Sequence, residues 1–431
     1  MPGRRLPAYP VWLAYTGVWA FVGSLSWTTA AVFFIRDVDM TPLQLVLTGT
    51  ALEVGYFLFE IPTGVVADMY SRRLSLIVAA VVSGIAMIIT GATHSAGVVI
   101  AAAALWGVGW TFRSGAEDAW LADELGQQRL GSAYQRSAQL ARIAGLLGIG
   151  GAVALAAVDL RLPFLAAGSV TILFAVFLAV AMPEHGFTRP ARSSGTSHLG
   201  AAATTARDGG RLVRAHPILM LVLAIAFVTG MWAEGFDRLW EAHLLLEVGL
   251  PDVAGLGDVV WFGLIGAGSL VLSFAVAAPL VTRIERLGQE SLARFLLLLH
   301  GLLILTALAF AWSATVWVAL VAYWATTVVR GLTEAPFRTW LNGAVADSRV
   351  RATVLSISGV TGSAGEWAGG PVLGVVGNRW SVRAALGVGA FLLTPTLALF
   401  ARAGRHYLGD QPQTTGTLVA TPKVKLRDVE P

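Results

Sequence analysis

Long apolar segments separated by short polar ones run through almost the whole of this 431-residue chain. A helix needs about 20 mostly apolar residues to cross the hydrocarbon core of a bilayer, and twelve segments meet that requirement. The first is too long for the apolar core of a signal peptide, so we interpret it as a span. The twelve segments lie near residues 11–34, 43–67, 74–93, 96–121, 133–158, 162–182, 218–245, 258–281, 291–312, 314–341, 352–376 and 382–402.

The composition points to the same class of protein. Only 13% of the residues are charged, whereas soluble domains carry about 25%. We therefore predict an all-α membrane protein. Cysteine is absent, which excludes disulfides, thiolate metal sites and cysteine nucleophiles. The sequence contains no P-loop, H-E-x-x-H, G-x-S-x-G or dinucleotide-binding motif, and its seven histidines are scattered. We expect no cofactor, no metal site, no enzymatic activity and no nucleic-acid partner.

Arginine is distributed unequally between alternate loops. Short cytoplasmic loops carry an excess of Lys and Arg. If the N-terminus is cytoplasmic, the outer loops hold only Arg36, Arg161, Arg379 and Arg383. The inner loops then hold Arg72, Arg73, Arg129, Arg136, Arg189, Arg192, Arg207, Arg211, Arg214, Arg283, Arg286, Arg349 and Arg351. This bias predicts a multi-pass protein of the cell membrane with both termini in the cytoplasm.

One polar segment divides the twelve spans into two sets of six. Residues 184–216 are rich in Gly, Ser and Thr and end in a basic stretch, which is typical of a linker. The predicted organisation is an N-terminal six-helix bundle at 1–183, a cytoplasmic central linker at 184–216, a C-terminal six-helix bundle at 217–403 and a disordered cytoplasmic tail at 404–431.

A short pattern repeats in the fourth and tenth spans and favours an internal repeat. Arg113 is followed by Glu117 in the fourth span, and Arg330 by Glu334 in the tenth, with an aromatic residue three positions after each Glu. Arg and Glu at this spacing share one face of a helix and can pair.

The end of the second span carries a family resemblance. Residues 59–73 read FEIPTGVVADMYSRR. This stretch resembles the signature loop of the major facilitator superfamily, G-x-x-x-D-R/K-x-G-R-R/K, with Gly64, Asp68, Arg72 and Arg73 in place. Met69 stands where the pattern has a basic residue. The stretches LWGVGW at 105–110, SGAEDAWLADE at 114–124 and FDRLWE at 236–241 are similar to the drug–proton antiporter branch, which includes macrolide and tetracycline efflux proteins.

The resemblance implies two six-helix bundles around a central cavity that opens alternately to each side of the membrane. It also implies export of an amphipathic small molecule or drug in exchange for protons. A cytoplasmic gate is expected from residues of the signature loop and of the repeated pattern. The alternative for the loop is a basic segment that only sets orientation. The gate residues are Gly64, Asp68, Arg72, Arg73, Arg113, Glu117, Arg330 and Glu334.

Acidic residues inside the spans are the candidates for proton coupling, because a charge within a span is costly and is usually retained for function. Glu53 and Glu366 lie about eleven and fourteen residues into their spans, near the bilayer midplane. Glu234 and Asp237 belong to a polar stripe in the seventh span that continues through Arg238. Burial favours the neutral form of a carboxylic acid. The alternative for each acid is a structural hydrogen bond between helices.

Aromatic side chains within the spans are candidates to line the cavity, where they could stack on a cationic compound. Packing is the alternative for each of them. The cavity candidates, with Arg238, are Trp27, Tyr56, Trp110, Trp232, Trp324 and Trp367. The expected partners are a small-molecule substrate, protons and the lipid bilayer, and the protein is expected to be a monomer. A metabolite or nutrient transporter (uniporter or symporter) is the first alternative. A non-transporting scaffold or receptor is the second.

Overall fold

The computed structural model describes residues 5–188, 217–251, 257–284, 287–344 and 348–409. All regular secondary structure in these ranges is helical, as predicted. The helices are α1 (Ala8–Trp27), α2 (Ala30–Arg36), α3 (Pro42–Met69), α4 (Arg72–Ala92), α5 (Ala96–Arg113), α6 (Ala116–Leu125), α7 (Gln127–Ala156), α8 (Leu162–Ala181), α10 (Pro217–His243), η1 (Leu244–Val248), α11 (Asp258–Ile284), α12 (Gln289–Ala311), α13 (Val316–Ala344), α14 (Ser348–Arg379), α15 (Val382–Leu392) and α16 (Thr394–Gly409).

These helices follow the twelve predicted spans in order, four of which are broken into two pieces. The first span is α1 with α2, the fourth is α5 with α6, the seventh is α10 with η1, and the twelfth is α15 with α16. Ten described helices are long and apolar enough to cross a membrane, and α11 contains a shorter apolar stretch, Asp258–Ser273. The protein is therefore a multi-pass, all-α membrane protein.

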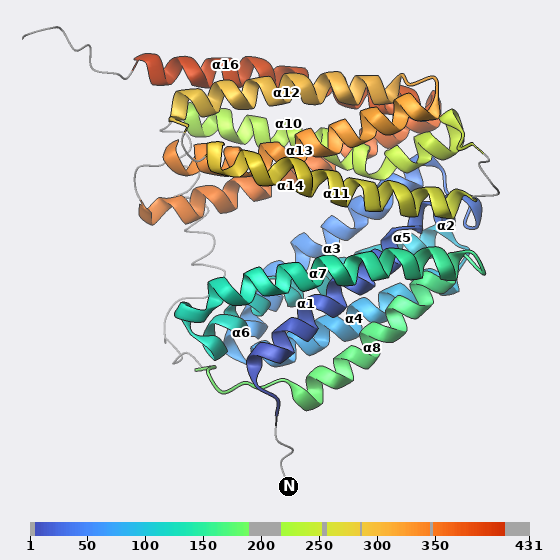
Figure 1. Cartoon of the computed structure of the whole chain (residues 1–431), viewed down its shortest axis with the longest axis vertical. Coiled ribbons are helices and arrows are strands. Elements are labelled where there is room, and N and C mark those ends of the chain that lie inside the picture. Colours follow the sequence, from blue (N-terminus) through green and yellow to red (C-terminus); the bar gives the residue numbers. More distant parts are fainter. Residues whose placement is uncertain (1–4, 189–216, 252–256, 285–286, 345–347, 410–431) are drawn as a thin grey trace, which may run out of the picture.

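The helices gather into two bundles (Figure 1). Helices α1 to α8 pack on one another, mainly through α1 with α7, α3 with α5 and α4 with α8. Helices α10 to α16 form the second bundle, in which α10 packs against α14, and α12 against α13 and α16. Most of the predicted linker, 184–216, and most of the predicted tail, 404–431, lie outside the described residues. Helix α16 runs to Gly409 and so enters the segment that was predicted as tail.

Close helix contacts depend on glycine, because small residues let membrane helices approach backbone to backbone. Between α3 and α5, a Cβ atom on Gly55 would lie 2.3 Å from the carbonyl oxygen of Ala104. Between α10 and α14, a Cβ atom on Gly365 would lie 2.1 Å from the carbonyl oxygen of Phe227. Helix α14 is rich in glycine and small polar residues, and with α10 it packs the second bundle against α3 of the first.

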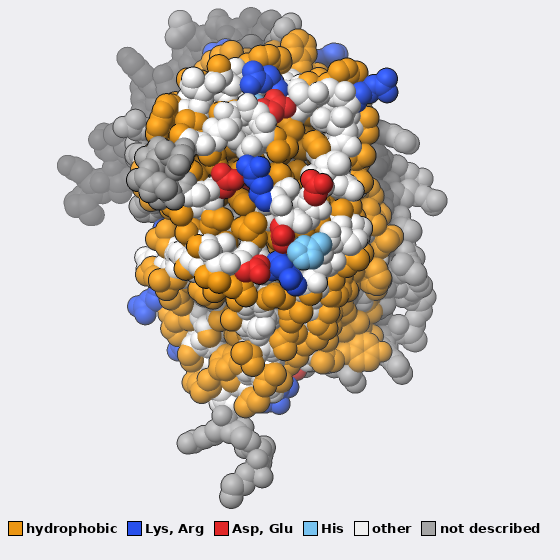
Figure 2. Space-filling model, turned by 90° about the vertical axis from the view of Figure 1, so that its right-hand side faces the viewer, with side chains coloured by type: hydrophobic (Ala, Val, Ile, Leu, Met, Phe, Trp, Pro, Cys, Tyr) orange, Lys and Arg blue, Asp and Glu red, His pale blue; other side chains and the backbone are white. Residues whose placement is uncertain are grey.

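The two ends of the molecule differ in how the bundles meet. We call the end at which α3 is followed by α4 the linker end, and the opposite end, where α2 stops at Arg36, the far end. In Figure 1 the far end lies on the right, where α2 approaches α11, and the bundles diverge toward the linker end on the left. Figure 2 looks onto the far end and shows charged side chains gathered across the middle of this face.

Polar contacts close the far end. The backbone N–H of Leu43 donates to Asn378 Oδ1 at 2.8 Å, and Asn378 Nδ2 donates to Thr41 Oγ1 at 3.4 Å. Arg36 pairs with Asp258 at 3.1 Å. Where both partners are described, the hydrogen bonds and ion pairs that join the two bundles are these far-end contacts. The structure is therefore a conformation closed at the far end.

Candidate functional site

Two ion pairs occupy the centre of the bundle interface. On α10, Arg238 Nε lies 3.1 Å from Oε1 of Glu234, whose side chain is 8% exposed. One turn away, Asp237 binds Arg330 of α13 in a bidentate pair, in which Nη2 donates to Oδ2 at 2.8 Å. The Arg330 guanidinium lies over the Trp232 ring, 5.5 Å from its centroid. Glu234 is the buried member of these pairs, and a buried charge is tolerated when it is paired; Asp237 and Arg330 are partly exposed.

The pair of Glu234 with Arg238 is tightly packed where the two bundles meet. A Cβ atom on Gly49 of α3 would lie 1.6 Å from Glu234 Oε1 and 2.4 Å from Arg238 Nε. A Cβ atom on Gly370 of α14 would lie 2.9 Å from Glu234 Cγ. The ion pair therefore fits only because glycine stands at Gly49, and α10 carries it directly against the backbone of the other bundle.

Glu53 of α3 and Glu366 of α14 lie beside these pairs, one on each bundle. Both side chains are half-buried. Glu53 interacts electrostatically with Glu234 and Arg238. Glu366 interacts with Glu53, Glu234, Asp237 and Arg330. In contrast to Glu234 and Asp237, neither acid has a hydrogen-bond or ion-pair partner within the described part of the chain.

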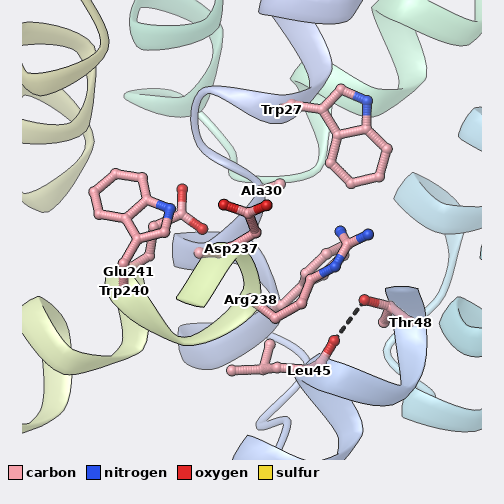
Figure 3. A pocket seen from close by; sticks show the side chains of 10 residues that line it. Trp27, Ala30, Leu45, Thr48, Asp237, Arg238, Trp240 and Glu241 are labelled. Atoms are coloured by element: carbon pink, nitrogen blue, oxygen red, sulfur yellow. Dashed lines mark hydrogen bonds between the residues drawn. The ribbon is translucent and has the colours of Figure 1, made fainter. Parts of the chain in front are cut away.

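A cavity of about 260 Å³ adjoins the cluster (Figure 3). Asp237, Arg238 and Glu241 supply charged groups from α10, and the indoles of Trp27 and Trp240 lie on opposite sides in the view. The other lining residues come from α2 and α3 and are Ala30, Ala31, Phe34, Leu45 and Thr48. Thr48 Oγ1 donates to the carbonyl oxygen of Leu45 at 2.6 Å, so its hydroxyl hydrogen is already used. Aromatic walls with a few charged groups suit a small amphipathic molecule.

The loop that closes the second span is tied to its own bundle. Arg72 forms an ion pair with Asp123 and donates to the carbonyl oxygen of Ala119 at 2.7 Å. The Arg73 backbone N–H donates to Glu184 Oε1 at 3.0 Å, and its guanidinium reaches the carbonyl oxygen of Ala179. Ser71 Oγ also donates to Glu184, at 2.7 Å. These bonds fix the loop against α6 and the end of α8.

Two other residues of this loop have few contacts. Asp68 is exposed and has no hydrogen-bond or ion-pair partner among the residues that the structure describes. A Cβ atom on Gly64 would meet nothing within 4 Å. The contact expected between Asp68 and the start of the eleventh span involves side chains that lie outside the described part of the structure.

A comparison with known families identifies the chain. A model of the Major Facilitator Superfamily matches residues 11–370. The chain belongs to the major facilitator superfamily. It is a membrane transporter rather than an enzyme.

Similar proteins support the fold of this major facilitator. An uncharacterized MFS-type transporter, YxaM of Bacillus subtilis (strain 168), is 22% identical over 241 residues; the match covers 56% of this chain and 59% of that protein's length. The nucleoside transporter NupG has a TM-score of 0.72 at 12% identity, with 92% of this chain and 98% of that chain covered. An inward-facing, unoccupied bacterial homolog of the human lysosomal transporter Spinster has a TM-score of 0.69 at 14% identity, with 94% and 98% covered.

The repeated Arg–Glu pattern forms a pair in only one half of the transporter. Arg113 Nε lies 2.7 Å from Glu117 Oε2, as predicted. Its guanidinium also lies 4.7 Å from the Trp19 ring centroid and 4.8 Å from that of Trp110. The span breaks directly after it, at Gly115, whose φ of +51° suits glycine.

The expected pair of Arg330 and Glu334 is wrong. Arg330 binds Asp237, and Glu334 binds Arg338 at 2.7 Å on the exposed face of α13. Asp237 accepts two hydrogen bonds from Arg330, and a bidentate pair is stronger than the single contact that Glu334 makes with Arg338. Arg330 therefore belongs to the central cluster and not to the linker end.

The predicted cavity residues are dispersed. Trp27 and Arg238 line the cavity of the transporter. Trp232 lies beneath Arg330, and Trp324 Nε1 donates to the carbonyl oxygen of Ile265 at 3.2 Å, which fastens α13 to α11. The remaining candidates pack away from the cavity, and one of them, Trp367 of α14, does so across the bundle interface. Trp367 packs on Phe57, Trp110 on Trp106, and Tyr56 interacts with Glu60.

Two groups of functional candidates were not predicted as site residues. Glu60 accepts hydrogen bonds from Ser114 Oγ at 3.0 and 3.1 Å, where α5 gives way to α6. Its spacing of seven residues from Glu53 places both on one face of α3, which was a usable signal. No feature of the sequence pointed to Asn378 and its far-end bonds, because an Asn near the end of a span resembles any other polar residue beside a loop.

Proposed function

We propose that this transporter exports an amphipathic small molecule from the cytoplasm in exchange for protons. Its linker end faces the cytoplasm and it resides in the cell membrane as a monomer. The uneven arginine content of the loops supports this orientation. With the linker end inside, the described conformation faces inward, because the hydrogen bonds of Asn378 and the pair of Arg36 with Asp258 close the outer side.

The observation that carries the proposal is the presence of two acids without a basic partner at the bundle interface. Among the residues that the structure describes, Glu234 and Asp237 are each paired with an arginine, whereas Glu53 and Glu366 have no basic partner. An unpaired acid at this depth is costly when charged and is retained for a role. Protonation removes the charge, so a proton gradient can alter the interactions of these two acids without breaking the ion pairs beside them.

The cavity next to the cluster supports an amphipathic substrate. The indoles of Trp27 and Trp240 offer apolar faces, and Asp237 and Glu241 offer negative charge near them. Acids outnumber arginines in the cluster, which favours a neutral or cationic compound over an anion. The cytoplasmic gate of the outward-facing state is assigned to Gly64, Asp68, Arg72 and Arg73, with the Arg113–Glu117 pair behind them.

A metabolite transporter is the second candidate. Arg238 lines the cavity while its Nε is bound to Glu234. A guanidinium has five N–H donors, so Arg238 has donors left over that could bind an anionic or hydroxyl-bearing metabolite. Transport that is independent of a pH gradient would favour this candidate.

The experiment is uptake of an amphipathic cation into inside-out vesicles, whose lumen corresponds to the outer side of the membrane, with and without an acidic lumen. Wild type is compared with Glu53→Gln and Glu366→Gln, with Glu334→Gln as the control because that acid is exposed and paired only locally. We expect gradient-dependent transport in wild type and in the control, and at least a tenfold loss in the other two variants. Equal transport in all four proteins would overturn the assignment of the two acids.

A further inference from the structure

We propose that Glu53 and Glu366 form one binding site for a single proton, built from both bundles and complete only when the far end is closed. This inference rests on the alternating access of the proposed function, but not on the identity of the exported compound. It differs from two independent proton carriers in the number of protons bound and in its dependence on conformation.

The contacts between α3 and α14 set the two acids opposite each other. The helices run in opposite directions along the bundle interface. Near the far end, a Cβ atom on Gly377 would lie 2.9 Å from Pro42, and one on Gly374 would lie 3.0 Å from Leu43. Further in, a Cβ atom on Gly370 would lie 3.1 Å from Val46 and 3.5 Å from Thr50.

The next contact along the same line fixes the register around the acids. The rings of Phe57 and Trp367 meet edge to face, with centroids 4.9 Å apart. Glu53 lies between Thr50 and Phe57 on α3, and Glu366 directly precedes Trp367 and lies one helical turn from Gly370 on α14. The two carboxyl groups therefore face each other across the interface, and their electrostatic interaction agrees with this placement.

Most other charged groups near Glu53 and Glu366 already have partners. On α10, Glu234 is bound to Arg238. Asp237 is bound to Arg330 of α13. On α3 itself, Glu60 is held by Ser114 of the fourth span and interacts with Tyr56. Glu241 of α10 also lacks such a partner among the described residues, but it lines the cavity two turns beyond Glu234. On the contact between α3 and α14, Glu53 and Glu366 are the two acids without a paired cation or donor among the described residues.

Two facing carboxylates in a low-dielectric site cannot both be charged at low cost. One proton between them replaces this repulsion with a charge-assisted hydrogen bond, in which one carboxyl donates to the other carboxylate. Opening the far end separates α3 from α14, and the bond is lost. Binding of one proton therefore favours the conformation closed at the far end, and its release to water favours opening.

This preference has the direction that antiport requires. A proton taken up from outside lets the acids approach and the far end close. A substrate that enters from the cytoplasm displaces the proton, which leaves two facing carboxylates. Their repulsion then drives the far end open and carries the substrate outward. No further reactant is needed, because the proton passes only between water and a carboxyl group.

The test measures far-end distance against pH. The chain lacks cysteine, so the exposed far-end residues Val158 and Ala314 can be changed to Cys and spin-labelled without background. Distances are recorded between pH 5 and pH 9 in lipid nanodiscs. Wild type should close as pH falls, with the closed-to-open ratio rising by at most about tenfold per pH unit, as binding of one proton requires. Glu53→Gln, Glu366→Gln and the double variant should all lose this dependence and stay closed to the same extent.

Other outcomes would overturn the inference. A ratio that rises by about a hundredfold per pH unit would mean two protons. Effects of the two substitutions that add in the double variant would mean independent sites. Glu366→Asp guards against misfolding, because it keeps a carboxyl group and should keep a pH response. If closure follows this pattern but no drug is transported, the inference stands and the proposed substrate fails. If drug transport is proton-driven but the effects of the two substitutions add, the proposed function stands and the shared proton site is ruled out.

Discussion

Glu234 Oε1 lies so close to α3 that a Cβ atom on Gly49 would be only 1.6 Å from it. The same added atom would lie 2.4 Å from Arg238 Nε. A single glycine thus lets the central ion pair of one bundle touch the backbone of the other. The closed far end depends on this fit.

Gly49→Ala should therefore force the Glu234–Arg238 pair away from α3. Overpacking of a tight interface typically costs about 1–3 kcal/mol. We expect a lower melting temperature in detergent and a shift toward the far-end-open conformation. Gly23→Ala in α1 is the matched control, because its Cβ atom would meet nothing within 4 Å. Equal melting temperatures for the two variants would contradict the described packing.

The bidentate pair of Arg330 with Asp237 should couple α13 to α10. In a double-mutant cycle with Arg330→Gln and Asp237→Asn, we expect a coupling energy of about 0.5–3 kcal/mol in thermal stability. The exposed pair of Arg338 with Glu334 provides the comparison and should give only about 0.3–0.5 kcal/mol. Similar values for both cycles would show that the central pair has no special structural role.

Asn378→Ala should loosen the far end. The substitution removes the hydrogen bond from the Leu43 backbone N–H and the one to Thr41 Oγ1. At about 0.5–1.5 kcal/mol for each bond, the far-end-open population should rise severalfold or more. Alkylation of a cysteine placed at Thr48, beside the cavity, measures access from the outer side. Ser132→Ala is a suitable control, since Ser132 bonds only to the carbonyl oxygen of Arg129 within its own helix. An unchanged alkylation rate would show that these bonds do not hold the gate.

Asp68→Asn tests the gate at the linker end. Asp68 has no partner among the described residues in the far-end-closed conformation, so its loss should not reduce the stability of that conformation. If Asp68 stabilises only the outward-facing state, transport should fall, while the far-end label distance should shift toward closure. Asp123→Asn is the counterpart, because it removes an ion pair that exists in the present conformation and should lower the melting temperature. Normal transport by Asp68→Asn would remove it from the gate.

The helices could be predicted from the sequence because apolar length alone determines which segments can cross a bilayer. The order of the twelve spans was confirmed. The pair of Arg113 with Glu117 was confirmed as well, although the two residues lie on either side of the break between α5 and α6 and not in one continuous helix. The same spacing failed for Arg330 and Glu334, because the better partner, Asp237, lies on a different helix.

The geometry of the central cluster could not be predicted. Pattern and depth gave Glu53 and Glu366 as separate acids near the midplane. Whether the two acids face each other depends on the register of α3 against α14. Gly370 and Gly374 determine this register, because they let α14 approach α3 closely. The sequence contains the glycines but does not show which helix they face. Their roles in proton coupling stay predictions.

The most direct test of the central claim is proton release from the purified transporter in weakly buffered detergent solution when amphipathic cations are added. We expect release of about one proton for each bound molecule, measured with a pH-sensitive dye. This release should be lost in Glu53→Gln and in Glu366→Gln but kept in Glu334→Gln. Binding without proton release from wild type would contradict the account and would indicate a uniporter or a different coupling ion.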